Sequence, residues 1–151
     1  MSTEVRPVDD DPDLLVVTDG ASRGNPGPSA AAFLIFDASG KEVHHEGKAL
    51  GPSTNNRAEY QAILSGLHEA QRRGGKRIQV FSDSELAVRQ LNGDYKVKDP
   101  EILALFNSVK EAVAAFESVS FVHVPREHPW VARADALANK ALDDGERQQR
   151  P

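Results

Sequence analysis

The hydrophobic residues of the first fifty positions form three short runs with turn residues between them. Residues 14–17 make a solidly apolar run, which is typical of a strand buried on both faces. A second apolar run covers 30–36, and a third strand is expected at about 42–50. The segments 22–29 and 37–40, which contain glycine, are predicted turns. This half of the chain therefore predicts an antiparallel meander of three strands.

From residue 56 onward the hydrophobic period is helical, and helices then alternate with strands. The expected elements are a helix at 56–73, a strand at 78–81, a helix from Ser84 to Leu91, a helix that Asp99 and Pro100 open, a strand at 119–124 and a helix from Pro129. This order predicts an α/β fold. Its five-stranded mixed sheet is an antiparallel meander followed by alternating helices and strands, with helices on both faces.

The composition limits the class of protein. The chain has 151 residues, of which 39% are hydrophobic, and this suffices for one domain with its own core. It contains no cysteine, which excludes a disulfide scaffold, a thiol nucleophile and a cysteine zinc site. No apolar run approaches the ~20 residues of a membrane span, and no signal-peptide pattern precedes the first strand. We therefore expect a soluble, cytoplasmic protein with no membrane contact.

The charge is uneven along the chain. Residues 1–13 hold five acidic residues and one basic residue, which predicts a disordered acidic tail. Residues 143–151 are expected to form a flexible polar end. The 15 acidic and 15 basic residues of the remaining domain, 14–142, balance each other, so the net charge of −5 comes from the two ends. A domain with this charge is compatible with a polyanion partner but does not predict one.

Four carboxylates occupy positions where hydrophobic residues or strand ends are expected. Asp19 follows the buried run 14–17, where an unpaired carboxylate is costly. Asp83 ends the strand predicted after the long helix, at the end of the sheet where open α/β folds have their sites. Glu59 shares a helix face with apolar residues, and Asp135 lies within the apolar stripe of the last helix, which should turn it toward the sheet.

Each of these carboxylates also has a local explanation. Glu59 with Asn56 fits a capping box, and Asp83 fits the N-terminal charge of a helix. Asp135 fits a boundary residue of an amphipathic helix, and Asp19 with the glycine after it fits a turn. If the four converge instead, their repulsion favours a divalent cation with oxygen ligands. The lack of cysteine and of histidine motifs favours Mg²⁺ or Mn²⁺ over Zn²⁺, and a two-metal carboxylate site suits phosphoryl transfer.

Four short segments, in this order along 14–142, resemble the blocks of type 1 ribonuclease H. They are Asp19-Gly-Ala-Ser-Arg-Gly-Asn-Pro-Gly27, Thr54-Asn-Asn-Arg-Ala-Glu59, Ser82-Asp83-Ser84 and Ala134-Asp135-x-Leu-Ala-Asn139. The resemblance implies the ribonuclease H-like fold. It also implies endonucleolytic hydrolysis of the RNA strand of RNA–DNA hybrids, which leaves 5′-phosphate and 3′-hydroxyl ends.

The same resemblance implies that the four carboxylates are catalytic metal ligands. Asp19 would bridge two Mg²⁺ ions in the substrate complex, with Mn²⁺ as the alternative ion. Asp135 would hold the ion that activates the attacking water, and Glu59 and Asp83 the ion that stabilises the leaving 3′-oxygen. Such a pair of ions clamps both ends of an in-line displacement.

Further residues resemble the family's contacts to the hybrid, in whose groove the 2′-hydroxyl distinguishes RNA from DNA. The expected substrate-binding residues are Gly20, Asn25, Thr54, Asn55 and Asn56, with Thr54 as part of a pocket for a DNA phosphate. For Thr54, Asn55 and Asn56 the alternative is helix capping. For Asn25 the alternative is an Asn-Pro turn.

The sequence departs from the family in three places. The basic protrusion of longer members is missing, because 91–98 leads directly to Asp99. The chain therefore resembles the shorter branch, and we expect weaker, more salt-sensitive binding of the hybrid. Val131 stands where the family often has Asn. No residue matches the family's mobile histidine cleanly; His128 is the nearest candidate for proton transfer, with a position beside the cap of the last helix as the alternative.

No obligate protein partner is evident, and we expect a monomer. Two other functions are compatible with the same residues. One is a non-catalytic module that binds RNA–DNA hybrids, and the other is a nuclease of the same fold that acts on double-stranded RNA or branched DNA. Assays with hybrid, double-stranded RNA and branched DNA separate the three.

Overall fold

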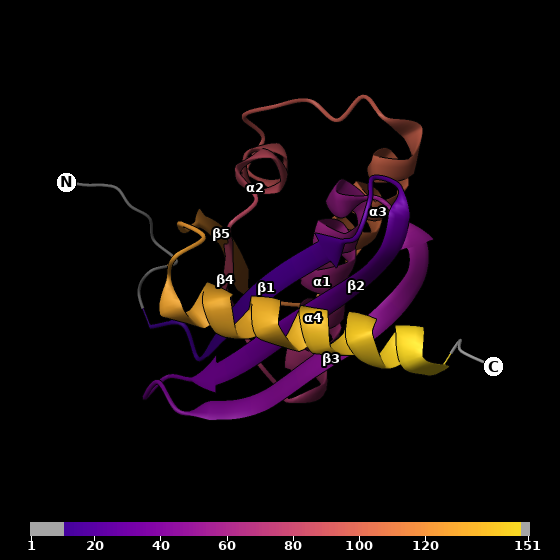
Figure 1. Ribbon diagram of the computed structural model, residues 1–151. Coiled ribbons are helices and arrows are strands. Elements are labelled where there is room, and N and C mark those ends of the chain that lie inside the picture. Colours follow the sequence, from indigo (N-terminus) through magenta and orange to yellow (C-terminus); the bar gives the residue numbers. More distant parts are fainter. Residues whose placement is uncertain (1–10, 149–151) are drawn as a thin grey trace.

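The computed structural model describes residues 11–148 and contains five strands and four helices (Figure 1). They are β1 (Leu14–Ser22), β2 (Gly27–Asp37), β3 (Glu42–Ser53), α1 (Asn55–Arg72), β4 (Arg77–Ser82), α2 (Glu85–Leu91), α3 (Pro100–Val113), β5 (Ser118–His123) and α4 (Pro129–Gln148). The predicted order of elements is confirmed. None of the helices in this part of the chain is long and apolar enough to cross a membrane.

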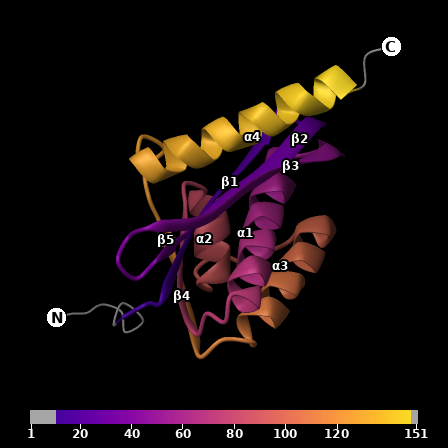
Figure 2. The same cartoon turned by 90° about the horizontal axis from the view of Figure 1, so that it is seen from below.

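The five strands form one mixed sheet in the order β3-β2-β1-β4-β5. β1, β2 and β3 are antiparallel neighbours, whereas β4 and β5 run parallel to β1. Helices α1, α2 and α3 lie on one face of the sheet and α4 crosses the other, as Figure 2 shows. The carboxyl ends of β1 and β4 therefore lie side by side, where the residues that end these strands can meet.

The central strand β1 contributes side chains to both cores. Val16 packs with Ile63 and Leu67 of α1, whereas Val17 packs with Val131 of α4. Both valines are fully buried, because successive side chains of a strand point to opposite faces. The predicted strand with both faces buried is confirmed, and this explains why the run is apolar at every position.

The helices begin at the residues that the sequence chemistry favours. The Oγ of Ser84 accepts the N–H of Ala87, and Asp99 caps α3 with Pro100 in the first turn. Thr54 caps α1, which begins at Asn55, one residue before the predicted start. These side chains accept hydrogen bonds from main-chain N–H groups that have no partner within their own helix.

The two ends of the domain differ from the prediction. Asp13 accepts a hydrogen bond of 2.9 Å from the main-chain N–H of Arg77, so the segment before β1 is held by β4. Residues 143–148 continue α4, so the helix extends into the segment for which a flexible end was predicted. The rest of the two expected tails, 1–10 and 149–151, lies outside the described residues.

Candidate active site

Asp19 lies within β1 and not after it, because the strand continues to Ser22. Its backbone pairs with Ala32 of β2, and the following residues keep the antiparallel register. The carboxyl group is held in the sheet and only 4% of the residue is exposed. The turn proposed as an alternative for Asp19 is therefore wrong. A rigid strand in the centre of the sheet fixes the position of this carboxylate.

Glu59 reaches Asp19 from α1. Its Oε1 accepts a hydrogen bond of 3.0 Å from the main-chain N–H of Gly20, and 6% of the residue is exposed. Because α1 is capped by Thr54, Glu59 does not occupy the third helical position that a capping box with Asn56 requires. The capping box is therefore wrong, and the side chain points into the site.

Asp83 completes a group of three carboxylates. It follows β4, immediately before the cap of α2, and 9% of its side chain is exposed. Ligand oxygens of Asp19, Glu59 and Asp83 all lie within 4.8 Å of one another. The predicted convergence of these three side chains is confirmed, and the group is a possible metal-binding site.

The electrostatics of this group favour a cation. Oδ2 of Asp19 and Oδ1 of Asp83 are buried and have no hydrogen-bond partner. Burial, followed by repulsion from Glu59, Asp83 and Asp135, raises the pKa of Asp19 to about 9. Burial and repulsion from Asp83 raise the pKa of Glu59 to about 8, against the hydrogen bond from Gly20. A bound divalent cation would supply the missing partners and remove the repulsion.

Asp135 approaches the group from α4. Its negative charge contributes to the raised pKa of Asp19. However, the residue is exposed, whereas Val131, Ala134 and Ala138 on the same helix are buried. The prediction that Asp135 shares the buried stripe is therefore wrong. It lies at the edge of the stripe and faces the group from its open side.

Arg126 is a charged neighbour that sequence analysis missed. Its Nε lies 3.7 Å from Oδ2 of Asp83, and its side chain is 86% exposed. Its positive charge also opposes the raised pKa of Glu59. The available signal was its position just after β5, because β5 is parallel to β4 and the two strands end at the same side of the sheet.

The predicted substrate-binding residues surround the start of α1. Oγ1 of Thr54 accepts the N–H of Arg57 at 3.2 Å, so the capping alternative is confirmed for Thr54. Asn55 and Asn56 occupy the first two positions of α1, and neither is its cap. The N–H of Asn55 donates to Oδ1 of Asn25 at 3.0 Å, which joins the loop after β1 to α1. These contacts show how the residues are held, and their binding of substrate stays a prediction.

His128 is the cap of α4. Its main-chain oxygen accepts the N–H of Ala132 at 2.9 Å, and its Nδ1 accepts the N–H of Trp130 at 3.1 Å. The ring also lies 5.3 Å from the ring of Trp130, between centroids. The alternative that places His128 at the helix cap is therefore closer to the observed contacts. Its part in proton transfer stays a prediction.

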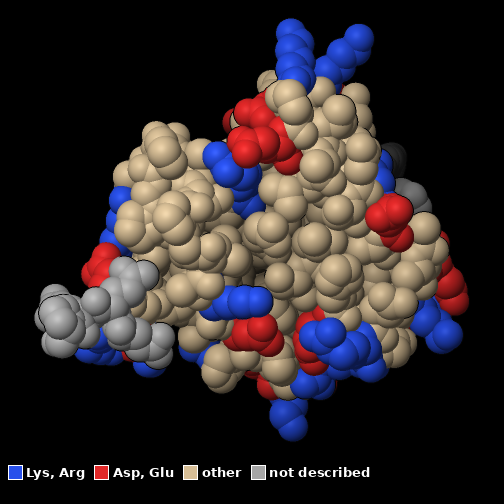
Figure 3. All heavy atoms as spheres, turned by 90° about the vertical axis from the view of Figure 1, so that its right-hand side faces the viewer, with Lys and Arg blue, Asp and Glu red and all other residues tan. Residues whose placement is uncertain are grey.

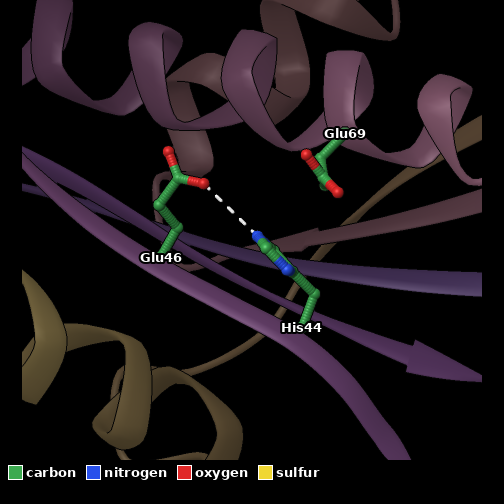
Figure 4. A group of neighbouring side chains, drawn as sticks. All are labelled: His44, Glu46 and Glu69. Carbon is green, nitrogen blue, oxygen red and sulfur yellow. Dashed lines mark hydrogen bonds and ion pairs between the residues drawn. The ribbon is translucent and has the colours of Figure 1, made fainter.

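A second group of potential metal ligands lies between β3 and α1 (Figure 4). Nε2 of His44 is 3.3 Å from Oε1 of Glu46, while Nδ1 is 3.2 Å from Nη2 of Arg73. The third member, Glu69, forms ion pairs with Arg72 and Arg73. The arginines already neutralise this group and occupy its acceptors, so it lacks the unpartnered buried oxygens of the first group.

The charged residues on the surface are mixed. On the face shown in Figure 3, Lys and Arg side chains stand in small groups with Asp and Glu among them. The guanidinium of Arg89 in α2 lies 5.4 Å from the centre of the ring of Tyr95, which is in the loop that follows this helix. The surface in this view therefore agrees with the balanced charge of the domain, and binding of a polyanion would depend on local contacts.

Comparison with known proteins identifies the family. A family model described as reverse transcriptase-like matches residues 17–141. Ribonuclease HI of Halobacterium salinarum is 41% identical over 126 residues, which are 83% of this chain and 62% of that protein. The bifunctional protein Rv2228c of Mycobacterium tuberculosis is 37% identical over 131 residues, which are 86% of this chain and 35% of that protein. The chain thus spans less than two thirds of the length of these two curated relatives.

Solved structures agree with this relationship. Ribonuclease H1 of Halobacterium salinarum superposes with a TM-score of 0.83 at 40% identity, covering 87% of this chain and 98% of that one. The N-terminal ribonuclease H domain of Rv2228c gives a TM-score of 0.86 at 33% identity, covering 92% and 99%. LC11-RNase H1, solved in complex with an RNA/DNA hybrid, gives 0.83 at 38% identity, covering 88% and 99%. The chain belongs to the type 1 ribonuclease H family, and the predicted ribonuclease H-like fold is confirmed.

Proposed function

We propose that this protein hydrolyses the RNA strand of RNA–DNA hybrids and leaves 5′-phosphate and 3′-hydroxyl ends. The observation that carries the proposal is the meeting of three carboxylates, the buried Asp19 and Glu59 and the partly buried Asp83, in which Asp19 and Asp83 each keep a buried oxygen without a partner. The similarity to ribonucleases H, one of them solved with a hybrid, supports this substrate.

The residues present fit divalent metal ions. Buried oxygens without partners and pKa values raised by mutual repulsion are both relieved by a cation with oxygen ligands. Asp19, Glu59 and Asp83 would hold the ions, and Asp135 would add a ligand from the open side. We propose Mg²⁺ as the physiological ion, with Mn²⁺ as a substitute. Bound there, the ions would stabilise the charge that develops at the phosphate and lower the pKa of the attacking water.

The protein chain holds these carboxylates in place. Strand β1 fixes Asp19, and the hydrogen bond from Gly20 orients Glu59 toward it. Asn25 accepts the N–H of Asn55 through Oδ1, so its amide N–H groups point away and can donate to acceptors in the groove of the hybrid. We propose Gly20, Asn25, Thr54, Asn55 and Asn56 as the surface that meets the hybrid.

The test is a substrate panel with the whole chain. We expect cleavage of a hybrid labelled on its RNA strand, in Mg²⁺ or Mn²⁺, and no cleavage of the DNA strand. Products with 5′-phosphates are expected. Binding without cleavage would support the non-catalytic module instead. Cleavage of double-stranded RNA or branched DNA in preference to the hybrid would assign the site to another nuclease activity.

Three further predictions accompany this function. We propose that His128 aids proton transfer through Nε2, because Nδ1 already accepts a hydrogen bond; a His128→Gln variant with an unchanged pH profile would contradict this role. A monomer is expected, which sedimentation tests. A cytoplasmic location is expected, which cell fractionation tests.

A further inference from the structure

Arg23 connects the loop between β1 and β2 to the C-terminal half of α4. Its Nη2 donates a hydrogen bond of 2.7 Å to Oδ1 of Asp143, and its Nη1 lies 3.0 Å from Oε1 of Glu146. Nη2 also lies 3.4 Å from the main-chain oxygen of Asn139. One guanidinium therefore contacts three residues on successive turns of the same helix.

The same loop is attached on its other side to α1. Oδ1 of Asn25 accepts the main-chain N–H of Asn55 at 3.0 Å. The main-chain N–H of Arg23 donates to the oxygen of Pro28 at 2.8 Å and closes the base of the loop. Between the two side-chain anchors lies Gly24, whose φ of 108° belongs to a backbone region that favours glycine. The loop is thus short, exposed and held by one side chain toward each helix.

These contacts are more important for the position of Asn25 than for the stability of the protein. The side chains of Arg23, Asp143 and Glu146 are 35%, 57% and 44% exposed, and ion pairs with this exposure contribute little to the free energy of unfolding. Among residues 11–148, no group accepts a hydrogen bond from the amide nitrogen of Asn25. Its N–H groups are therefore available for a ligand if the loop stays in place.

We propose that Arg23 is a positioning residue, which holds Asn25 in register with the hybrid through its ion pairs to Asp143 and Glu146. The inference rests on the proposed function, in which Asn25 meets the hybrid. Without the ion pairs the loop samples other positions, and part of the binding free energy is spent on ordering it. Asp19 is held by strand pairing and not by this loop, so the chemical step is expected to be unaffected.

The experiment measures kcat and KM for hybrid cleavage with two complementary changes. Arg23→Gln removes the cation, and the double variant Asp143→Asn/Glu146→Gln removes its partners. We expect each to raise KM by about 3- to 10-fold with kcat within about 2-fold of wild type, which is the signature of lost binding shared by ground and transition states. If Arg23 contacted a phosphate directly, removing the two acids would free it and lower KM. A lowered or unchanged KM in the double variant would overturn the inference.

A double-mutant cycle connects the effect to Asn25. In the Asn25→Ala background, Arg23→Gln is expected to raise KM no further, since both changes remove the same contact. Additive effects would overturn the inference. Melting temperatures are expected to stay within about 2 °C of wild type, as for other exposed ion pairs. A joint fall of melting temperature and kcat would assign Arg23 a merely structural role.

The matched control is Lys140→Gln, which removes an ion pair of 2.9 Å between Lys140 and Asp144 within α4. This pair does not involve the loop, so KM is expected to be unchanged; a rise equal to that of Arg23→Gln would overturn the inference. Failure of the proposed function is distinguishable, because wild-type protein would then not cleave the hybrid. Cleavage by wild type with no effect of the Arg23 changes would remove this inference alone.

Discussion

The main-chain N–H of Gly20 donates a hydrogen bond of 3.0 Å to Oε1 of Glu59, across 39 positions of the sequence. This bond joins the residue after Asp19 to the helix that packs on β1. It requires a very close approach of the two elements, because a Cβ on Gly20 would lie 2.4 Å from the main-chain carbon of Ala58 and the main-chain nitrogen of Glu59. The arrangement of the three carboxylates therefore depends on glycine at position 20, where any side chain would collide with α1.

The first prediction concerns this close approach. Gly20→Ala is expected to lower the free energy of unfolding by about 1–3 kcal/mol or more, because the clash is with backbone atoms that cannot rotate away. Hybrid cleavage should fall as well, since α1 and Glu59 are displaced. Urea unfolding and a cleavage assay measure the two effects.

Gly145→Ala is the matched control for that change. Gly145 lies in α4, and a Cβ there would lie 3.4 Å from Cβ of Ala49, at ordinary contact distance. Alanine is favoured over glycine in a helix by up to ~1 kcal/mol, so this variant is expected to be more stable than wild type. A Gly20→Ala protein as stable as the control would contradict the account of the close approach.

The second prediction concerns pH in the presence of a chelator. The pKa values of Asp19 and Glu59 are raised to about 9 and about 8, whereas carboxyl groups of the unfolded chain titrate near pH 4. Between these limits the folded state binds more protons than the unfolded state. The free energy of unfolding of the metal-free protein is therefore expected to fall as the pH rises from about 5 to about 9.

The other charged groups near Asp19 and Glu59 do not change the direction of this pH dependence of stability. Asp83 and Asp135 add negative charge, whereas the hydrogen bond from Gly20 and the charge of Arg126 oppose the raised pKa of Glu59 without reversing it. Glu42 has a pKa lowered to about 2, mainly by hydrogen bonding to Arg133. Its contribution to the free energy of unfolding is complete above about pH 5 and is lost only in more acidic solution. Urea unfolding at pH 5, 7 and 9 measures the slope. Asp19→Asn should flatten it, and stability that rises with pH would contradict the electrostatics described.

The third prediction concerns metal binding. Mg²⁺ or Mn²⁺ is expected to raise the melting temperature, because an ion that binds only the folded state at 100 times its Kd stabilises it by about 2.7 kcal/mol. For a domain of this size the shift is on the order of 5–10 °C. Thermal melts across a metal titration measure it.

The titration is controlled by substitutions in each of the two groups of potential metal ligands. Asp19→Asn is expected to abolish most of the shift. His44→Gln, which removes the central ligand of the group with Glu46 and Glu69, should leave it intact. A shift that depends on His44 and not on Asp19 would place the ion in the wrong group and refute the metal site proposed.

Much of the fold was predictable because local chemistry and hydrophobic period agree in most elements. The caps at Ser84 and Asp99 and the doubly buried strand around Val16 each follow from a short stretch of sequence. The convergence of Asp19 with Glu59 was predictable for a different reason: a carboxylate next to a buried run needs a partner or an ion.

Other features depend on tertiary geometry that no short stretch encodes. Asp135 lies one position from the buried Ala134, and a helix places such neighbours about 100° apart, so small differences in packing decide its exposure. Arg126 acquires its neighbour Asp83 only through the parallel pairing of β4 with β5. The attachment of Arg23 to Asp143 likewise needed the course of α4 across the sheet.

The most direct test of the central claim is cleavage of a labelled hybrid by wild-type protein and by Asp19→Asn, with melting curves of both in chelator. Asp94→Asn, at an exposed aspartate, controls for the loss of a single charge. We expect Asp19→Asn to lose about 10²- to 10³-fold or more in rate while its melting temperature in chelator stays the same or rises, because a repelling charge is gone. Wild-type rates of RNA-strand cleavage by Asp19→Asn in Mg²⁺ would contradict the claim that these carboxylates form the active site.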